Sequence, residues 1–241
     1  MKLPKKVVYV ISAVAAAIVL FFVFLLSPLF HISEVIITGN MRTPDEEIIG
    51  RMQVDETTNL VFFRSRGARQ RLKQNFFIAA VTFRREIPNI LHVHIDERRL
   101  MAYAEHMGLF LYLDDFARVV DIRSYKSEPR PLLVGLNIRS FQMGERLDIP
   151  NTIALNAIVH YSLLLYHHGL IDRVAHMDVS DTNNIRILIG YWEFNVGGVL
   201  GADEKIRYII AMLEAMPYEG IMRGFTDLRG LGPQFIFEIL Q

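Results

Sequence analysis

The sequence predicts an α+β protein tethered by a single N-terminal transmembrane helix. Three observations support this fold class: an uncharged apolar stretch near the N-terminus, a strand–helix–helix–strand–strand pattern after it, and a longer region in which short strands predominate. Two helices on one face of a small sheet enclose a core of their own, so the middle pattern predicts a separate domain. We expect a cytoplasmic stub over 1–6, a transmembrane helix over 7–27, a first domain over 28–99 and a second domain over 100–241.

The apolar stretch runs from Val7 to Leu26 and contains no charged residue. At ~1.5 Å of rise per residue, a helix of that length crosses a hydrocarbon core of ~30 Å. Lysines precede the stretch and the next charged residue is Glu34, so the positive-inside rule places the N-terminus in the cytoplasm and the rest of the chain outside. A cleaved signal peptide is the alternative, but its small residues, 13–17, lie in the middle of the apolar run. The sequence therefore favours a retained, single-pass anchor.

Composition narrows the function classes for the part that follows the anchor. The chain carries 26 basic and 26 acidic residues, and without the N-terminal lysines it is slightly acidic, which does not suggest a nucleic-acid partner. No cysteine is present, which excludes disulfides, thiolate nucleophiles and cysteine-based zinc sites. The core alone must hold the fold, and a hydrophobic content of 51% can supply that core.

Apolar periodicity predicts the elements of the first domain. A short strand is expected within 31–38, followed by a helix with Thr43 as its N-cap and Pro44 as its first residue. A second helix and two strands complete the domain, and in both strands apolar residues alternate with polar ones, so each has one buried and one solvated face. The expected ranges are 66–74 for the helix and 79–85 and 90–97 for the strands.

Strands predominate from Leu100 onward, and we expect a largely antiparallel sheet. Two helices interrupt the strands, and the buried face of the first is expected to carry Ile153, Ala157, Tyr161 and Leu164. A hairpin is expected across Gly190. The predicted strands are 101–105, 109–113, 117–122, 174–179, 185–189, 191–196, 225–229 and 235–240, and the helices are 152–168 and 203–216.

Several short motifs of the first domain, taken in order, resemble a POTRA domain. They are Phe30-His31-Ile32, Thr38-Gly39-Asn40, Asn59-Leu60, the hairpin Arg84–Asn89 and Asp96-Glu97-Arg98. Placed directly after one N-terminal span, this arrangement resembles the FtsQ/DivIB cell-division proteins. The second domain continues the resemblance with Tyr112-Leu113-Asp114, Leu132–Leu136, Gly201, Lys205 and Asp227-Leu228-Arg229. The family's usual glycine after the first of these motifs is absent, and Phe116-Ala117-Arg118 stands there instead.

The resemblance implies a non-enzymatic scaffold of the bacterial division septum. It implies a protein of the cell (inner) membrane whose extracytoplasmic part docks the paired coiled-coil proteins FtsB/DivIC and FtsL, together with other divisome components. Carried over by position, it assigns Arg229 to the partner contact, with Gly230 next to it, although 230–234 differ from the family in residue type. Phe235 and Phe237 are our own prediction, because a terminal edge strand presents unpaired N–H and C=O groups to a partner strand. Ordinary core positions are the alternative for both phenylalanines.

The sequence shows no catalytic constellation, and we expect no catalytic, cofactor-binding or metal-ligating residues. His92 and His94 share one strand face, but no third ligand accompanies them. Asp114-Asp115 and the pair Asp178 with Asp181 are better explained as turn residues than as acid/base pairs. Neither a nucleophile elbow nor a phosphate-binding glycine loop is present.

Basic residues accumulate between Glu56 and Glu86, where no acidic residue occurs. A solvated helix face is the simpler explanation, and contact with anionic lipid headgroups or wall polymers is the alternative. The residues in question are Arg64, Arg66, Arg69, Arg71 and Lys73.

Two other functions stay open at this point. One is a POTRA protein of polypeptide transport, or a chaperone-like POTRA protein. Such a protein would need a C-terminal membrane barrel, which is built from long strands with alternating lipid-facing residues, and no such strands are expected here. A membrane-anchored cell-wall hydrolase or transferase is the alternative from the class of enzymes.

Overall fold

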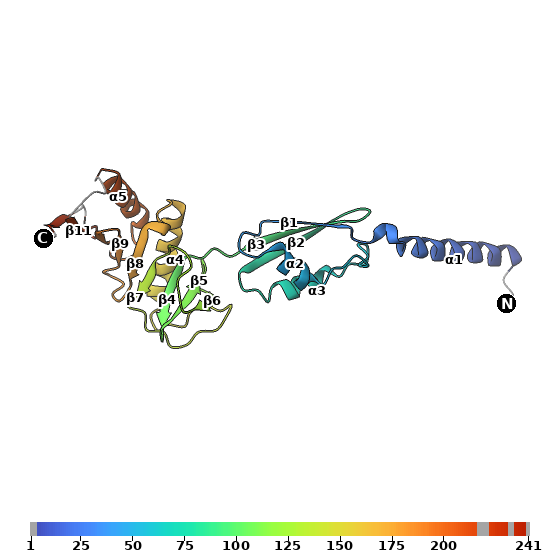
Figure 1. The fold of residues 1–241 in the computed structure, drawn as a ribbon, viewed down its shortest axis with the longest axis horizontal. Coiled ribbons are helices and arrows are strands. Elements are labelled where there is room, and N and C mark those ends of the chain that lie inside the picture. The colour runs from blue at the N-terminus through green and yellow to red at the C-terminus, as the bar shows by residue number, and fades with distance from the viewer. Residues whose placement is uncertain (1–3, 216–221, 231–233, 240–241) are drawn as a thin grey trace. The chain divides into compact units, whose positions relative to one another are not determined.

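The structure is a computed structural model (Figure 1). It describes the backbone of residues 4–215, 222–230 and 234–239, and the side chains of these residues except 5, 8, 222–223 and 234–239. The chain divides into two compact units, Met1–Glu97 and Arg98–Gln241, each with a hydrophobic core of its own. This mixture of helices and sheets confirms the predicted α+β class.

The N-terminal stretch forms helix α1, Lys5–Leu25, followed by the 3₁₀ turn η1, Pro28–Phe30. Ser27 caps this turn, since its hydroxyl accepts a hydrogen bond from the backbone N–H of Leu29. Among the residues that the structure describes, no helix was found to combine the length and the apolar character needed to cross a membrane. The span expected over 7–27 therefore stays a prediction.

The rest of the first unit has the predicted order of elements. They are β1 (Glu34–Thr38), α2 (Asp45–Met52), α3 (Ser65–Leu72), β2 (Ile78–Glu86) and β3 (Ile90–Glu97). In the sheet β3 is central, parallel to β1 and antiparallel to β2. Both helices bury one apolar face against this sheet, and their core residues are Ile48, Met52, Ala68 and Leu72, which pack with Leu91, Val93 and Ile95 of β3.

The start of α2 differs from the prediction, because Thr43 is not its N-cap. Pro44 takes that position without a side-chain cap, while Thr43 is buried. The carboxylate of Glu97, at the end of β3, accepts hydrogen bonds from three backbone N–H groups that precede the helix, those of Met41, Arg42 and Thr43, at 2.9–3.1 Å. A carboxylate more than fifty residues away thus accepts the hydrogen bonds of this loop. Capping rules consider only residues next to the helix, so they do not predict this contact.

The second unit contains one nine-stranded sheet in the order β12-β11-β10-β9-β8-β7-β4-β5-β6. Its elements are β4 (Ala102–His106), β5 (Leu109–Leu113), β6 (Val119–Arg123), β7 (Leu132–Val134), α4 (Thr152–His167), η2 (Ile171–Arg173), β8 (Val174–Asp178), β9 (Arg186–Ile189), β10 (Trp192–Asn195), α5 (Ala202–Ala215), β11 (Met222–Asp227) and β12 (Gln234–Ile239). The strands β7 and β8, β4 and β7, and β10 and β11 pair in parallel, so the sheet is mixed. Parallel neighbours need a crossover, which α4 provides between β7 and β8 and α5 provides between β10 and β11.

Helix α4 buries a face that is shifted from the predicted one. Ala157 and Tyr161 are buried as expected, but Ile153 is 65% exposed and Leu164 is only partly buried. Asn151 caps the helix by accepting from the backbone N–H groups of Ile153 and Ala154. The core face instead follows Ala154, Leu155, Ile158 and Leu165, which pack against the sheet.

The turn after β5 shows how the family's missing glycine is replaced. Ala117 adopts a left-handed backbone conformation with φ of 57°, the conformation that a glycine would favour. The buried carboxylate of Asp114 accepts hydrogen bonds from the backbone N–H groups of Phe116 and Arg118 at 2.9 and 2.8 Å, and pairs with the guanidinium of Arg98 at 2.8 Å. These bonds hold the turn, which confirms Asp114 as a turn residue.

Gly224 lies under the ring of Trp192, its register partner on β10. A Cβ atom placed on Gly224 would lie 1.6 Å from the nearest ring atom. Glycine in a strand interior normally weakens the strand. Here glycine is required nonetheless, because the indole occupies the space that a side chain would need.

We therefore expect Gly224→Ala to destabilise the second unit by about 1–3 kcal/mol, because the ring must move to make room. Gly50→Ala is the matched control: Gly50 lies inside α2 with no heavy atom within 4 Å of its added Cβ, and the change should stabilise the first unit by about 0.5–1 kcal/mol. Differential scanning calorimetry of the full chain measures both. A Gly224→Ala variant as stable as the original chain would contradict this account of the Trp192–Gly224 contact.

Candidate partner-binding site

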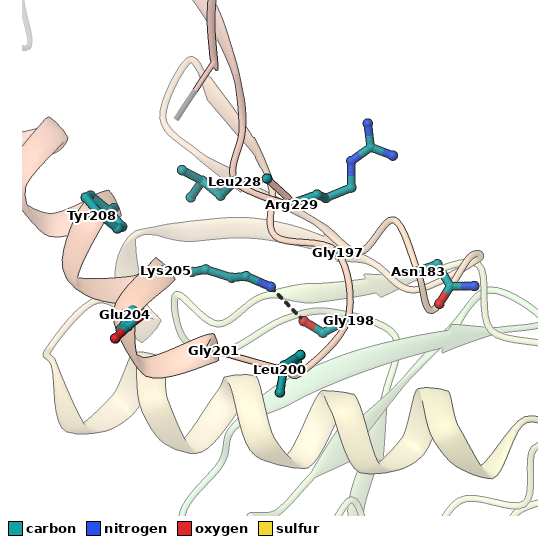
Figure 2. Close-up of a pocket in the computed structure, with 11 residues that line it drawn as sticks. Asn183, Gly197, Gly198, Leu200, Gly201, Glu204, Lys205, Tyr208, Leu228 and Arg229 are labelled. Carbon is teal, nitrogen blue, oxygen red and sulfur yellow. Dashed lines mark hydrogen bonds between the residues drawn. The ribbon is translucent and has the colours of Figure 1, made fainter. Parts of the chain in front are cut away.

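A cavity of about 440 Å³ lies where β10 runs into α5 and where β11 ends (Figure 2). Two of the predicted partner contacts, Arg229 and Gly230, are among the residues that line it. The others are Asn183, Gly197, Gly198, Leu200, Gly201, Glu204, Lys205, Tyr208 and Leu228. The cavity thus joins the β10–α5 connection to the C-terminal end of β11.

The glycine-rich connection between β10 and α5, residues 196–201, is held by two side chains from different helices. The ammonium of Lys205 on α5 donates hydrogen bonds to the carbonyl groups of Val196 (2.6 Å) and Gly198 (3.1 Å), and Figure 2 shows this side chain reaching across to the connection. The hydroxyl of Tyr161 on α4 donates to the Gly198 carbonyl at 2.8 Å. Burial lowers the pKa of Lys205 and raises the pKa of Tyr161. These bonds fix one wall of the cavity.

Arg229 is fixed in place and yet open to solvent. Its Nε lies 2.9 and 3.0 Å from the two carboxylate oxygens of Asp227, and its guanidinium also donates to the side-chain oxygen of Asn184. The aliphatic part of the side chain covers Gly197, where an added Cβ would lie 2.9 Å from Cγ of Arg229. The side chain is 48% exposed, so a cation is held at the rim of the cavity where a partner can reach it.

The strand β12 lies at the outer edge of the sheet and pairs antiparallel with β11. Phe235 is opposite Thr226 and Phe237 is opposite Gly224, in line with Phe194 and Trp192 of β10. Among the strands that the structure describes, none pairs with the outer side of β12. The side chains of both phenylalanines lie outside the described residues, so their partner contacts stay predictions.

The predicted basic set falls into two groups. Arg69 donates through Nε to the carbonyl of Val81 at 3.1 Å, and Arg71 donates to the carbonyls of Arg51 and Met52. These two guanidiniums therefore take part in holding the first unit together. Three members are exposed and make no hydrogen bond or ion pair through their side chains within the described part of the chain: Arg64, Arg66 and Lys73.

The histidines and aspartates considered for chemistry have local partners. His92 lies 2.7 Å from a carboxylate oxygen of Glu86, and Nδ1 of His94 lies 3.0 Å from the hydroxyl of Thr38. Asp178, the last residue of β8, and Asp181, in the turn after it, each accept a backbone N–H from the residue two positions further along, which is the bond that aspartate makes in turns. A search of the described residues found no group of three or more side chains able to hold a metal ion.

Sequence reasoning missed the role of Tyr161 and of Asn184 in this site. The sequence predicts Tyr161 only as a core residue. Helical periodicity does not show that its hydroxyl donates to the carbonyl of Gly198, more than thirty residues later in the chain. For Lys205 the sequence indicates only a match to a family motif, and not the two carbonyl groups to which its ammonium donates. Asn184 lies in a turn with Asp181, whose carboxylate it contacts, and its bond to Arg229 crosses 45 residues. A local pattern cannot show such contacts.

Comparison with known proteins agrees with this fold. Residues 30–98 match the family described as POTRA domain, FtsQ-type. A cell division protein DivIB from Clostridium tetani is 20% identical over 212 residues, which cover 87% of this chain and 80% of that protein. The DivIB of Clostridium botulinum strain Hall is 21% identical over 232 residues, covering 92% of this chain and 91% of that protein. Along most of its length the chain is thus similar to DivIB cell-division proteins, and residues 30–98 match an FtsQ-type POTRA domain.

A third DivIB matches a shorter part of the chain. The DivIB of Staphylococcus aureus is 29% identical over 91 residues, which cover 38% of this chain and 21% of that protein. The two clostridial alignments extend well beyond the POTRA domain, so the similarity includes the second unit. These three relatives all carry the name cell division protein DivIB.

The pair Asp227–Arg229 predicts a pH dependence of stability. The guanidinium of Arg229 lowers the pKa of Asp227. A carboxyl group whose pKa is lowered on folding contributes stability above its unfolded pKa of about 3.9, and this contribution is lost as the pH falls through the folded pKa. The difference in unfolding free energy between the original chain and Asp227→Asn should thus be level from neutral pH to about 4 and shrink below that.

Urea unfolding of the full chain across this pH range measures the difference. The signal is the fluorescence of Trp192, which is the only tryptophan of the chain and pairs with β11. Arg229→Ala, which removes the partner cation but keeps the backbone N–H that Asp227 accepts, should reduce the same pH dependence. A stability difference that stays constant at acid pH would contradict the Asp227–Arg229 account.

Proposed function

We propose that this chain is a non-enzymatic scaffold of the bacterial divisome that docks the FtsB/DivIC and FtsL pair through its second unit. Similarity to the FtsQ/DivIB family supports a role in cell division. The observation that carries the docking proposal is the position of β12 at the open edge of the sheet, next to a cavity rimmed by Arg229.

Strand addition is the binding mode that this geometry favours. An edge strand directs alternate N–H and C=O groups outward, and a partner segment that pairs with them gains main-chain hydrogen bonds of about 0.5–1.5 kcal/mol each. Arg229 is already held by Asp227 and Asn184, so an acidic side chain of the partner can meet it at little cost in side-chain entropy. The cavity beside it can receive one apolar side chain of the partner.

Partner capture tests the proposal. The full chain is immobilised in detergent and offered the purified FtsB/DivIC–FtsL pair. We expect Arg229→Ala to weaken capture about tenfold, and Phe235→Asp and Phe237→Asp to weaken it while the chain remains folded. Ile153→Asp is the matched control, because it also places a carboxylate at an apolar position of the same unit, one that is exposed on α4.

Two results would remove the interface assignment. If the variants at 235 and 237 unfold, these residues are core positions and the edge contact must be carried by other residues. If the folded variants, including Arg229→Ala, bind as the original chain does, the partner binds elsewhere. Turnover of wall polymers by the purified chain would contradict the non-enzymatic role.

We also propose that α1 anchors the protein in the cell membrane, with the N-terminal stub in the cytoplasm and both units outside, at the division septum. The uncharged run Val7–Leu26, the lysines before it and the exposure of its large apolar side chains support this anchor. Since no described helix was found to qualify as a span, the anchor needs a direct test.

The absence of cysteine makes that test free of background labelling. Lys2→Cys and Met41→Cys place single thiols in the stub and in an exposed loop after β1. In spheroplasts or intact single-membrane cells, a maleimide that cannot cross the membrane should label Met41→Cys at once and Lys2→Cys only after lysis. Labelling in the reverse order, or release of the protein by alkaline carbonate, would contradict the anchor.

A further inference from the structure

One loop of the first unit lies beside the point where the chain leaves α1. The side-chain amide of Asn59 donates to the carbonyl of Leu25, the last residue of α1, at 2.8 Å. Backbone hydrogen bonds join Ile32 to Thr58 (2.9 Å) and Leu60 to Phe30 (2.8 Å). Residues 58–62 therefore run next to the segment by which the chain enters the POTRA domain.

A second loop, the β2–β3 turn, lies at the same end of the domain. The backbone N–H of Ser33 donates to the carbonyl of Asn89 at 3.0 Å, and Glu34 pairs with Ile90 at the start of β1. The guanidinium of Arg85 donates to the carbonyl of Phe63 at 2.7 Å and so ties the two loops together. The exit of α1 and both loops thus share one end of the POTRA domain.

Each of these segments exposes a large apolar side chain: Leu29 is 53%, Phe62 47% and Ile87 61% exposed. Arginines stand close to them in the chain, and three are exposed without a hydrogen bond or ion pair within the described part of the chain: Arg64, Arg66 and Arg84. Two acidic residues also lie at this end: Glu34 is exposed at the start of β1, and Glu86 lies 2.7 Å from His92. We call these six residues, Leu29, Phe62, Arg64, Arg66, Arg84 and Ile87, the helix-exit surface.

We infer that the helix-exit surface rests on anionic lipid headgroups, with Phe62 and Ile87 dipping into the interfacial layer. This inference rests on the proposed anchor, because a span formed by α1 brings a bilayer to this end of the domain. An anionic lipid surface can accept both kinds of side chain in the helix-exit surface. The apolar side chains enter the interfacial layer, and the arginines contact the negatively charged headgroups. A soluble wall polymer would satisfy the arginines but not Phe62 and Ile87.

The structure also separates contacting from non-contacting cations on α3. Arg69 and Arg71 are engaged with backbone carbonyls. Lys73 is exposed at the opposite end of α3, and with ~1.5 Å of rise per residue it lies about 14 Å along the axis from Arg64. Lys73→Glu therefore changes charge by the same amount as Arg64→Glu or Arg66→Glu but away from the helix-exit surface.

The test is hydrogen exchange of the full chain reconstituted in vesicles. Vesicles of phosphatidylcholine alone are compared with vesicles that also contain phosphatidylglycerol, at low and high salt. We expect amides of 59–66 and 84–90 to exchange more slowly on the anionic vesicles at low salt, by about fivefold for each arginine in contact. The double variant Arg64→Glu/Arg66→Glu should lose this protection, Phe62→Ser should reduce it, and Lys73→Glu should keep it.

Other results would overturn the inference. Equal exchange on both vesicle types removes the lipid contact, and equal protection in the Arg64→Glu/Arg66→Glu variant removes the role of these arginines. Protection that appears only when an anionic wall polymer is added assigns the surface to that polymer instead. Failure of the chain to remain in vesicles after alkaline carbonate treatment would contradict the anchor itself, and so separates a failure of the proposed function from a failure of this contact.

Discussion

The parallel pairing of β10 with β11 is the interaction on which the second unit's binding end depends. It exists because α5 crosses over between the two strands, and the ring of Trp192 can lie over this pair because position 224 has no side chain. β11 in turn pairs with β12 at the edge of the sheet, and Arg229 follows two residues after the end of β11, next to the connection that leads into α5. A change that separated β10 from β11 would therefore remove the edge strand, the fixed cation and the cavity together.

The site is polar, and its polar groups are held in place before any partner arrives. Tyr161 and Lys205 satisfy the carbonyls of the glycine-rich connection, while Asp227 and Asn184 hold the guanidinium of Arg229. Because these side chains are already ordered, binding immobilises few additional rotamers. The arrangement suits recognition of a segment of another protein.

Strand alternation and helical periodicity were enough to predict the order of the elements, because these patterns arise from burial of one face. The prediction for β5, Leu109–Leu113, has the observed bounds, and the motif resemblance located the POTRA domain. Rules based on neighbouring residues gave a wrong prediction where a residue far away in the chain supplies the hydrogen-bond acceptor. The carboxylate of Glu97 serves the loop before α2, so Thr43 is not needed as a cap.

The parallel pairs of the sheet and the acceptors of two basic residues also depend on distant parts of the chain. The prediction of a largely antiparallel sheet agrees with the described strands, of which five neighbouring pairs are antiparallel and three are parallel. The parallel pairs were not predicted, because the sequence pattern alone does not show that the two helices are crossovers between neighbouring strands. Five basic residues were grouped by their spacing, but Arg69 and Arg71 find backbone carbonyl acceptors on other elements. Alternation along one strand also cannot decide whether Phe235 and Phe237 belong to the core or to a partner.

The central claim, that a partner strand adds to the edge of the sheet at β12, is tested most directly by hydrogen exchange with and without the purified FtsB/DivIC–FtsL pair. The account predicts that alternate backbone amides within 234–239, those directed away from β11, become protected in the complex, while amides of the opposite edge strand, β6, exchange as before. A stable complex in which the exchange of β12 is unchanged would contradict it.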